Sequence, residues 1–290
     1  MKQLIKLKLF ALMLLTFAAV PAFSQTNEAA KSRGEELLVK AREAIGGDAK
    51  INAVKSLSLA GKFQLGPAIN EVEFDFLFPD KYLKREKLST PLGLATRTYG
   101  LDGETAWINV TSPNAAIQFQ NVSQKDADDQ KFVSRAGAAR WILGLLLRTT
   151  GRSSTEISYA GEGDADGKRA DLIDVKGADG FQTRLFLDKA THRLAMMSYT
   201  GKLMSSKRTN VKTDQNGNIT QEESDSTGST VAGMKTDEVR VRFSDYRAVD
   251  GIQIPHRVVF QSGAGTKEEW ELTKVQINAA LAPEMFKKKG

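Results

Sequence analysis

The chain has 290 residues, 41% of them hydrophobic, with no cysteine, two histidines and a formal net charge of +6. The lack of cysteine excludes disulfides, thiol catalysis and a lipid anchor on a processed N-terminal cysteine. Basic residues are mixed with acidic ones and do not form the cluster that a nucleic-acid surface needs, so we expect no nucleic-acid partner.

The first 24 residues have the three parts of a secretory signal. Three lysines among the first eight residues give a positive start, residues 9–20 are apolar, and the small residues of 21–24 (PAFS) precede Gln25. The alternative is an uncleaved membrane anchor, but a span needs about 20 apolar residues and the lysines interrupt this run too early. We predict export to the periplasm and a signal peptide cleaved before Gln25, which lowers the net charge to +3. Residues 25–290 are then expected to form a single domain without a transmembrane anchor.

The predicted domain begins with an amphipathic helix over residues 28–45. Apolar residues recur there at spacings of three and four, and Gly46-Gly47 follow where a glycine stop is expected. A short helical turn over 49–54 leads into the strands. From residue 56 the period of the pattern changes to two.

Residues 69–78 form the clearest predicted strand. Alternate positions from 72 to 78 are apolar and mostly aromatic, and the positions between them are mostly acidic, which is typical of an antiparallel strand with one buried face. Pro79-Asp80 then turn the chain. Residues 81–88 continue as a charged strand, which we expect to be exposed.

The rest of the chain is dominated by short strands and tight turns. Further strands are expected at 94–100, 104–110, 115–121, 155–161, 169–176, 181–187, 192–199, 239–249, 252–260 and 267–277. Asp-Gly pairs at 102–103, 166–167, 179–180 and 250–251 suit hairpins, because both positions tolerate positive φ. Consecutive strands without intervening helices predict an α+β chain that is mostly antiparallel β.

Two longer segments interrupt the strands. Residues 124–149 are predicted to form a helix whose last two turns are apolar nearly all round, so this helix should be buried on more than one side. Residues 201–236 are polar and resemble an insertion. They are either a functional or disordered stretch, or a small protruding hairpin turned by Asn216-Gly217.

The residues that usually carry chemistry do not converge. His192 and His256 are far apart, and a metal site needs three or four ligands. Residues 162–167 resemble the first half of a calcium loop, but position twelve is Ile173, so an exposed hairpin turn is favoured. Acid pairs such as Glu71 and Glu73, or Glu268 and Glu269, suit a solvated strand face. No nucleophile elbow, Walker loop or dinucleotide fingerprint is present. We therefore expect no enzyme activity, metal or cofactor.

Apolar side chains on the predicted strands and the long helix remain as binding candidates. They either form an ordinary core or line a cavity for an apolar ligand between sheet and helix. The candidates for such a cavity are Val72, Phe74, Phe76, Phe78, Trp107, Trp141, Leu145, Phe186, Met197, Trp270 and Leu272.

Several short motifs resemble the superfamily of periplasmic lipoprotein-localisation carriers (LolA-like) and their outer-membrane lipoprotein-sorting relatives. These motifs are Ala44-Ile45-Gly46-Gly47, Phe78-Pro79-Asp80-Lys81-Tyr82, Leu185-Phe186-Leu187-Asp188 with Thr191-His192, and Asp250-Gly251-Ile252-Gln253-Ile254-Pro255-His256. The resemblance implies a half-open β-barrel wrapped over an N-terminal helix and a long apolar helix, with a cavity for acyl chains. Arg97 is a candidate for a cargo-gating group, although an exposed arginine explains it equally. The polar segment 201–236 departs from a compact carrier.

We expect a monomeric periplasmic binder or carrier of an apolar ligand, namely a lipid or the acyl chains of a lipoprotein. The alternative is a non-enzymatic interaction or sensing module of the envelope that binds a protein partner through the same fold, for instance through residues 201–236. A third hypothesis, a hydrolase of unfamiliar type, needs acids with perturbed pKa values that converge in a cleft.

Overall fold

The structure, a computed structural model, describes residues 22–65, 68–90, 93–112, 124–149, 155–177, 180–213, 219–225, 232–263 and 267–288. The first 21 residues lie outside the described residues, so the signal peptide and its cleavage before Gln25 stay predictions. The strand expected at 115–121 also lies outside them.

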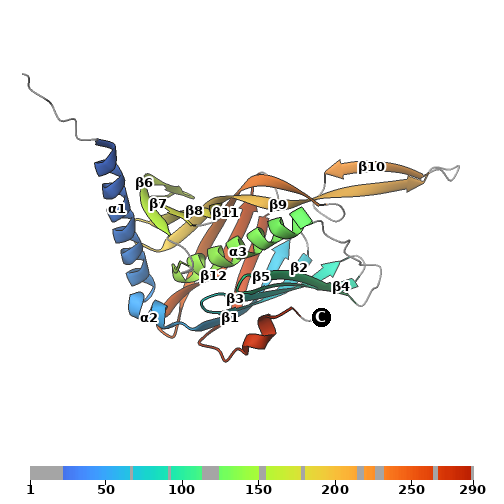
Figure 1. Cartoon of the computed structure of the whole chain (residues 1–290), viewed down its shortest axis with the longest axis horizontal. Coiled ribbons are helices and arrows are strands. Elements are labelled where there is room, and N and C mark those ends of the chain that lie inside the picture. The colour runs from blue at the N-terminus through green and yellow to red at the C-terminus, as the bar shows by residue number, and fades with distance from the viewer. Residues whose placement is uncertain are drawn as a thin grey trace, which may run out of the picture.

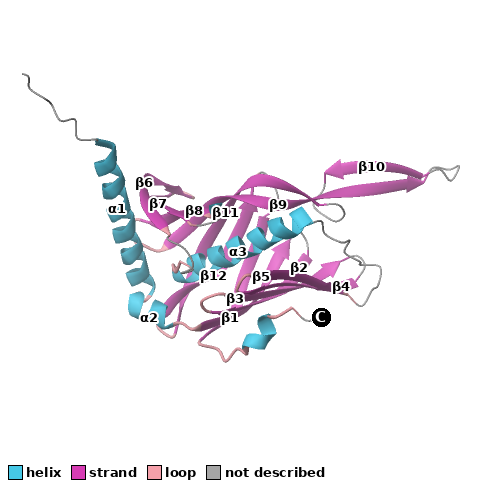
Figure 2. Cartoon of the chain, in the orientation of Figure 1, coloured by secondary structure: helices cyan, strands magenta, loops and turns pink. Residues whose placement is uncertain are grey.

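The described chain is built from three α-helices, thirteen strands and one short 3-10 helix (Figure 2). The helices are α1 (Ala22–Ile45), α2 (Asp48–Ala53), α3 (Gln124–Leu146) and the 3-10 helix η2 (Pro283–Phe286). The strands are β1 (Ser56–Leu65), β2 (Ala68–Leu77), β3 (Lys81–Thr90), β4 (Gly93–Asp102), β5 (Thr105–Thr111), β6 (Glu156–Ala165), β7 (Lys168–Lys176), β8 (Gln182–Asp188), β9 (Leu194–Thr213), β10 (Ile219–Asp225), β11 (Ala232–Val249), β12 (Ile252–Ser262) and β13 (Lys267–Ile277).

All strands belong to one antiparallel sheet. Its order is β5-β4-β3-β2-β1-β13-β12-β11-β9-β8-β7-β6, and β10 pairs with β9 beside this path. Within the described residues β5 and β6 are the two edges and do not pair with each other, so the sheet remains open. The predicted α+β class with an incomplete barrel is confirmed.

Helix α3 lies across one face of the sheet, which we call the inner face (Figure 1). Side chains alternate between the two faces of a strand, so Phe74 and Phe76 of β2 are fully buried on the inner face while Glu71 reaches solvent on the outer face. The apolar residues 141–147 are all buried, as the sequence predicts. The helix ends three residues before the predicted boundary because Leu147 has a φ of +49°, outside the helical region.

Helix α1 stands at the β6 end of the sheet (Figure 1). Its residues Leu37, Leu38 and Ala41 are buried, which confirms the predicted apolar stripe, although the helix starts six residues earlier than expected. A Cβ on Gly34 would lie 2.8 Å from backbone atoms of Ser158 and Tyr159, so the helix and β6 touch backbone to backbone at this glycine. None of the helices in the described ranges is long and apolar enough to cross a membrane.

The Asp-Gly turns are only partly as predicted. Both residues have positive φ at 166–167 and 250–251, where they join β6 to β7 and β11 to β12. At 102–103 only the glycine has positive φ, and Asp179 lies outside the described residues.

The polar segment 201–236 is mostly strand in its described part. β9 and β11 pair with each other out to Ser206 and Ala232, and β9 then continues in a hairpin with β10. This arm extends away from the rest of the sheet (Figure 1). The hairpin alternative is thus confirmed for the described backbone and the unstructured alternative is wrong there, while Asn216-Gly217 lie outside the described residues.

Candidate functional site on the inner face of the sheet

Four aromatic side chains meet where α3 lies on the inner face, and we call them the inner aromatic cluster: Phe74, Trp141, Phe260 and Trp270. The ring centroid of Trp141 lies 4.5 Å from that of Phe74, 5.5 Å from Phe260 and 5.7 Å from Trp270. Trp270 also stacks on Phe63 at 4.5 Å. Trp141 therefore anchors α3 to strand β2 near the start of the sheet sequence and to β12 and β13 near its end.

Most of the predicted cavity residues gather in this core. Those buried in the main core are Val72, Phe74, Phe76, Trp141, Leu145, Met197, Trp270 and Leu272, and Phe78 packs at its margin. Phe186 belongs instead to a second, smaller cluster with Ala165, Ala170 and Met196. Alternate residues of β8 point to opposite faces of the sheet. Leu185 and Leu187 occupy the main core, so Phe186 between them points to the outer face.

Trp107 also lies apart from the other candidates. Its ring packs over Gly100, where a Cβ would collide with it, and its Nε1 donates a hydrogen bond to the Phe286 carbonyl at 2.9 Å. Together with Leu83 and Met285 it lines a hollow of about 170 Å³ on the outer face. Trp107 therefore holds the C-terminal segment against the sheet.

A group of charged side chains adjoins the aromatic cluster on the inner face, and we call it the inner charge cluster: Lys84, Glu86, Arg97 and Glu268. Glu86 is 2% exposed. Its carboxylate accepts hydrogen bonds from Arg97 Nε at 2.8 Å and contacts Arg97 Nη2 at 2.6 Å, and it also pairs with Lys84. Burying the carboxylate of Glu86 is expensive unless cations neutralise it, and Lys84 and Arg97 do so here.

Lys84 joins the two clusters. Its Nζ lies 5.1 Å from the ring centroids of Tyr99 and Trp270 and 5.9 Å from that of Phe74. Arg97 Cζ lies over the same Tyr99 ring, 5.4 Å from its centroid. The positive charges thus face the electron-rich faces of the aromatic rings, a favourable contact that strengthens when water is excluded.

Glu268 is the least satisfied member of the cluster. It accepts a hydrogen bond from Trp270 Nε1 at 3.3 Å, and no cation pairs with it among the described residues. Burial raises the pKa of Glu268, and the nearby carboxylate of Glu86 adds to this, while Lys84 and Arg97 oppose it. Burial alone would raise the pKa of Glu86 too, but Lys84 and Arg97 hold that pKa below its ordinary value.

Sequence reasoning missed most of this charge cluster. The strand at 81–88 exists, but the prediction that it is exposed is wrong. Lys84 and Glu86 point inward with Tyr82 and Leu88. Leu83, on the outer face, is buried as well. Glu268 was expected in a solvated acid pair, whereas only Glu269 is on the outer face, paired with Arg257 at 2.5 Å. The apolar residues at positions 82 and 88 were the available signal, because strand period two puts 84 and 86 on their face.

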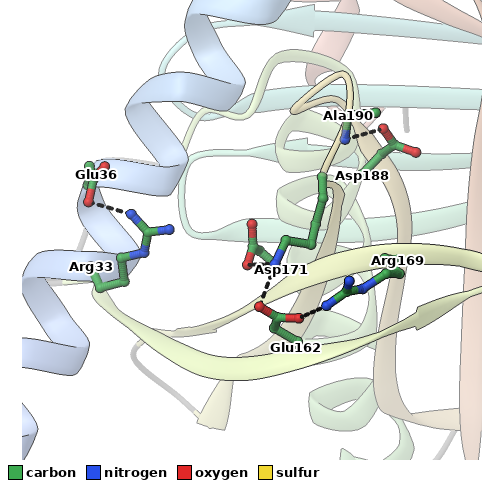
Figure 3. Close-up of polar contacts among 8 residues, drawn as sticks. Arg33, Glu36, Glu162, Arg169, Asp171, Asp188 and Ala190 are labelled. Carbon is green, nitrogen blue, oxygen red and sulfur yellow. Dashed lines mark hydrogen bonds and ion pairs between the residues drawn. The ribbon is translucent and has the colours of Figure 1, made fainter.

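The remaining sequence candidates have structural partners. Glu162 of the calcium-like loop pairs with Arg169 at 2.7 Å and with Lys189 (Figure 3). His256 is buried, and its Nδ1 lies 2.9 Å from the Ile254 carbonyl oxygen. In the described ranges no group of three or more His, Asp or Glu side chains could hold a metal ion.

Asp188 organises the turn that contains His192. Its carboxylate accepts a hydrogen bond from the backbone N–H of Ala190 at 3.1 Å (Figure 3). It also accepts hydrogen bonds from the backbone N–H and the hydroxyl of Thr191 at 2.8 and 2.9 Å. The turn joins β8 to β9, which begins two residues later than the strand expected at 192–199.

Comparison with known proteins gives likeness of structure only. No family profile matches the chain, and no curated protein matches its sequence. The chain is similar to an outer membrane lipoprotein-sorting protein domain from Vibrio parahaemolyticus, with a TM-score of 0.46, 11% identity, and coverage of 88% of this chain and 97% of that one. It is also similar to a LolA superfamily protein from Nitrosomonas europaea (TM-score 0.47, 10% identity, coverage 88% and 97%). A third similar structure is a DUF1329 family protein from Desulfovibrio piger (TM-score 0.42, 10% identity, coverage 89% and 97%). The first two carry the names of the superfamily that the sequence motifs resemble.

Proposed function

We propose that this chain is a non-enzymatic binder or carrier of an apolar ligand in the cell envelope. Acyl chains of a lipid or lipoprotein lie on the inner face of the sheet. They displace the apolar half of α3, which covers this part of the face. The N-terminal sequence pattern supports export. The open sheet supports ligand entry, because its two edges can part without breaking a strand pair.

One observation carries this proposal: α3 lies on an aromatic surface built by strands from both ends of the chain. Trp141 fits among Phe74, Phe260 and Trp270. Removing an acyl chain from water releases about 25 cal/mol per Å² of apolar surface. The same aromatic surface therefore stabilises either the docked helix or a bound acyl chain, and the exchange between them costs little.

Replacing Phe260 with glutamine should weaken acyl-chain binding about tenfold. Full burial of such a side chain contributes roughly 1.5–3 kcal/mol, and the half-buried Phe260 contributes about half of the upper value, or about 1.4 kcal/mol. The same replacement at Phe186 is the matched control, since Phe186 is also half-buried but packs in the outer cluster. Binding is measured by titration with a fluorescent fatty acid, with thermal unfolding to show that both variants fold.

Mass spectrometry of the organic extract from protein purified without detergent gives the natural ligand. A near-stoichiometric acylated species supports the proposal. A clean extract, together with equal probe affinity in the wild type and both phenylalanine variants, contradicts it.

The projecting arm favours a second candidate function, the binding of a protein partner in the envelope. Beyond Ser206 and Ala232 the described backbone of β9 and β10 pairs only with itself and extends beyond the sheet (Figure 1). A long projecting hairpin can give a partner access to its backbone without disturbing the core.

Excising residues 207–231 and joining Ser206 to Ala232 through Asn-Gly tests this candidate. These two residues face each other in the β9–β11 ladder, so a two-residue turn can close them without strain. We expect an unchanged melting temperature and unchanged acyl binding. A partner identified by cross-linking to the intact chain should be lost from the excised variant if the arm binds it. If the same partner is retained, the arm is not its binding surface.

A further inference from the structure

The inner charge cluster lies in a position that an apolar ligand alone does not explain. We propose that the ligand is an amphiphile with an anionic head, a carboxylate or a phosphate, which Arg97 and Lys84 bind while its tail lies on the inner aromatic cluster. This inference rests on the proposed function and specifies the chemical class of its ligand.

Arg97 has the geometry for such a head. Its side chain is 36% exposed, unlike that of Glu86 beside it. Glu86 engages Nε and Nη2 of the guanidinium, and no described residue bonds Nη1. A planar guanidinium with a free N–H edge suits the oxygen pairs of carboxylates and phosphates.

The hydrogen-bond donors of the cluster leave room for one more anion. Lys84 and Arg97 share the carboxylate of Glu86. Glu268 accepts a hydrogen bond from Trp270 Nε1 and forms no ion pair with a described cation, so it does not occupy the donors of Lys84 or Arg97. Nη1 of Arg97 therefore remains available to an anion in a partly buried setting, where electrostatic attraction is stronger than in water.

The head site and the tail site are contiguous. Lys84 Nζ lies 5.1 Å from the Trp270 ring, and Trp270 lies 5.7 Å from Trp141 on α3. A ligand head at Arg97 thus places its tail on the rings that contact α3. A purely structural role for these charges predicts no preference among ligand heads.

Three ligands with the same tail separate these cases: dodecanoate, dodecyl phosphate and dodecanol, titrated calorimetrically against the full chain. We expect both anions to bind at least ~10-fold more tightly than dodecanol, since hydrogen bonds to charged groups contribute more than neutral ones. Arg97→Gln should remove most of that preference and leave dodecanol binding unchanged. Arg85→Gln is the matched control, because Arg85 is on the same pair of strands but pairs with Glu73 and Asp75 on the outer face.

Arg97→Lys keeps the charge without the planar fork and guards against misfolding of the glutamine variant; it should retain part of the preference. A higher affinity for dodecyl phosphate indicates a phospholipid-type ligand, and a higher affinity for dodecanoate indicates a fatty acid. The inference is overturned if the wild-type protein binds all three ligands equally, or if the anion preference survives in both Arg97 variants. Either result leaves the proposed function intact. Failure of all three to bind overturns both.

Discussion

Replacing Glu86 with glutamine should lower the free energy of unfolding by about 3 kcal/mol, the largest effect we expect from a single polar substitution. Glu86 is 2% exposed and pairs with both Lys84 and Arg97. Removing one partner of a buried ionic group leaves the others desolvated without compensation, which costs about 3–5 kcal/mol. Urea unfolding at pH 7 measures the loss. Glu71→Gln on neighbouring β2 is the control, because its pair with Lys87 is exposed and its loss should leave stability nearly unchanged.

The effect of Glu86→Gln should depend on pH. Lys84 and Arg97 lower the pKa of Glu86 in the folded chain below its ordinary value of 4.5, against the opposing effect of burial. A carboxyl with a lowered folded pKa contributes stability that is fully present above the unfolded pKa and lost as the pH falls through the folded pKa. The difference between wild type and variant should be constant from pH 7 to about 5 and shrink below pH 4.5. A difference that stays constant down to pH 3 would contradict the ionic origin of the effect.

Replacing Gly144 with alanine should destabilise the protein by about 1 kcal/mol, whereas the same change at Gly137 should stabilise it by about 0.5–1 kcal/mol. Both glycines are in α3, where alanine gains roughly 0.5–1 kcal/mol of helix propensity. A Cβ at Gly144 would lie 2.5 Å from the Phe243 ring and 3.1 Å from Met197 Cε, so overpacking costs about 1–3 kcal/mol. At Gly137 nothing lies within 4 Å.

The variants Gly144→Ala and Gly137→Ala also test whether α3 moves when a ligand binds. If α3 leaves the inner face when an acyl chain binds, a variant with weaker docking of α3 shifts the population toward the binding-competent state. Gly144→Ala should then bind a fluorescent fatty acid more tightly than Gly137→Ala does. Equal affinities would mean that α3 stays in place and that ligands bind elsewhere.

The architecture was predictable because its local signals agree. Period-two alternation in β2, the Gly46-Gly47 helix stop and the Asp250-Gly251 turn each specify one conformation. The apolar end of α3 indicated burial on several sides. Agreement among such signals is what makes a fold readable from one sequence.

The charge cluster was not predictable in the same way. Lys84 and Glu86 read as solvent-facing because charged residues are rarely buried. The cluster forms only because β4 and β13 bring Arg97 and Glu268 to the same face as these residues. That arrangement depends on pairing between segments that are distant in the sequence. Phe186 and Trp107 were misplaced for the same reason, since an aromatic residue on a strand does not reveal which face is covered.

The order in which the strands pair has a consequence for how the molecule is made. β1 pairs with β13, so Leu57 lies opposite Ile277. In contrast, β1–β5 and β6–β9 run through consecutive hairpins, β11 pairs back onto β9, and β11–β13 again pair in chain order. Each set of hairpins needs only local chain and can form early during synthesis, whereas the seam between them needs the last strand. The inner face spans this seam, with Phe74 on one side and Phe260 on the other. Until β13 has been synthesised, the unfinished chain therefore exposes apolar aromatic side chains that a chaperone or a membrane can bind.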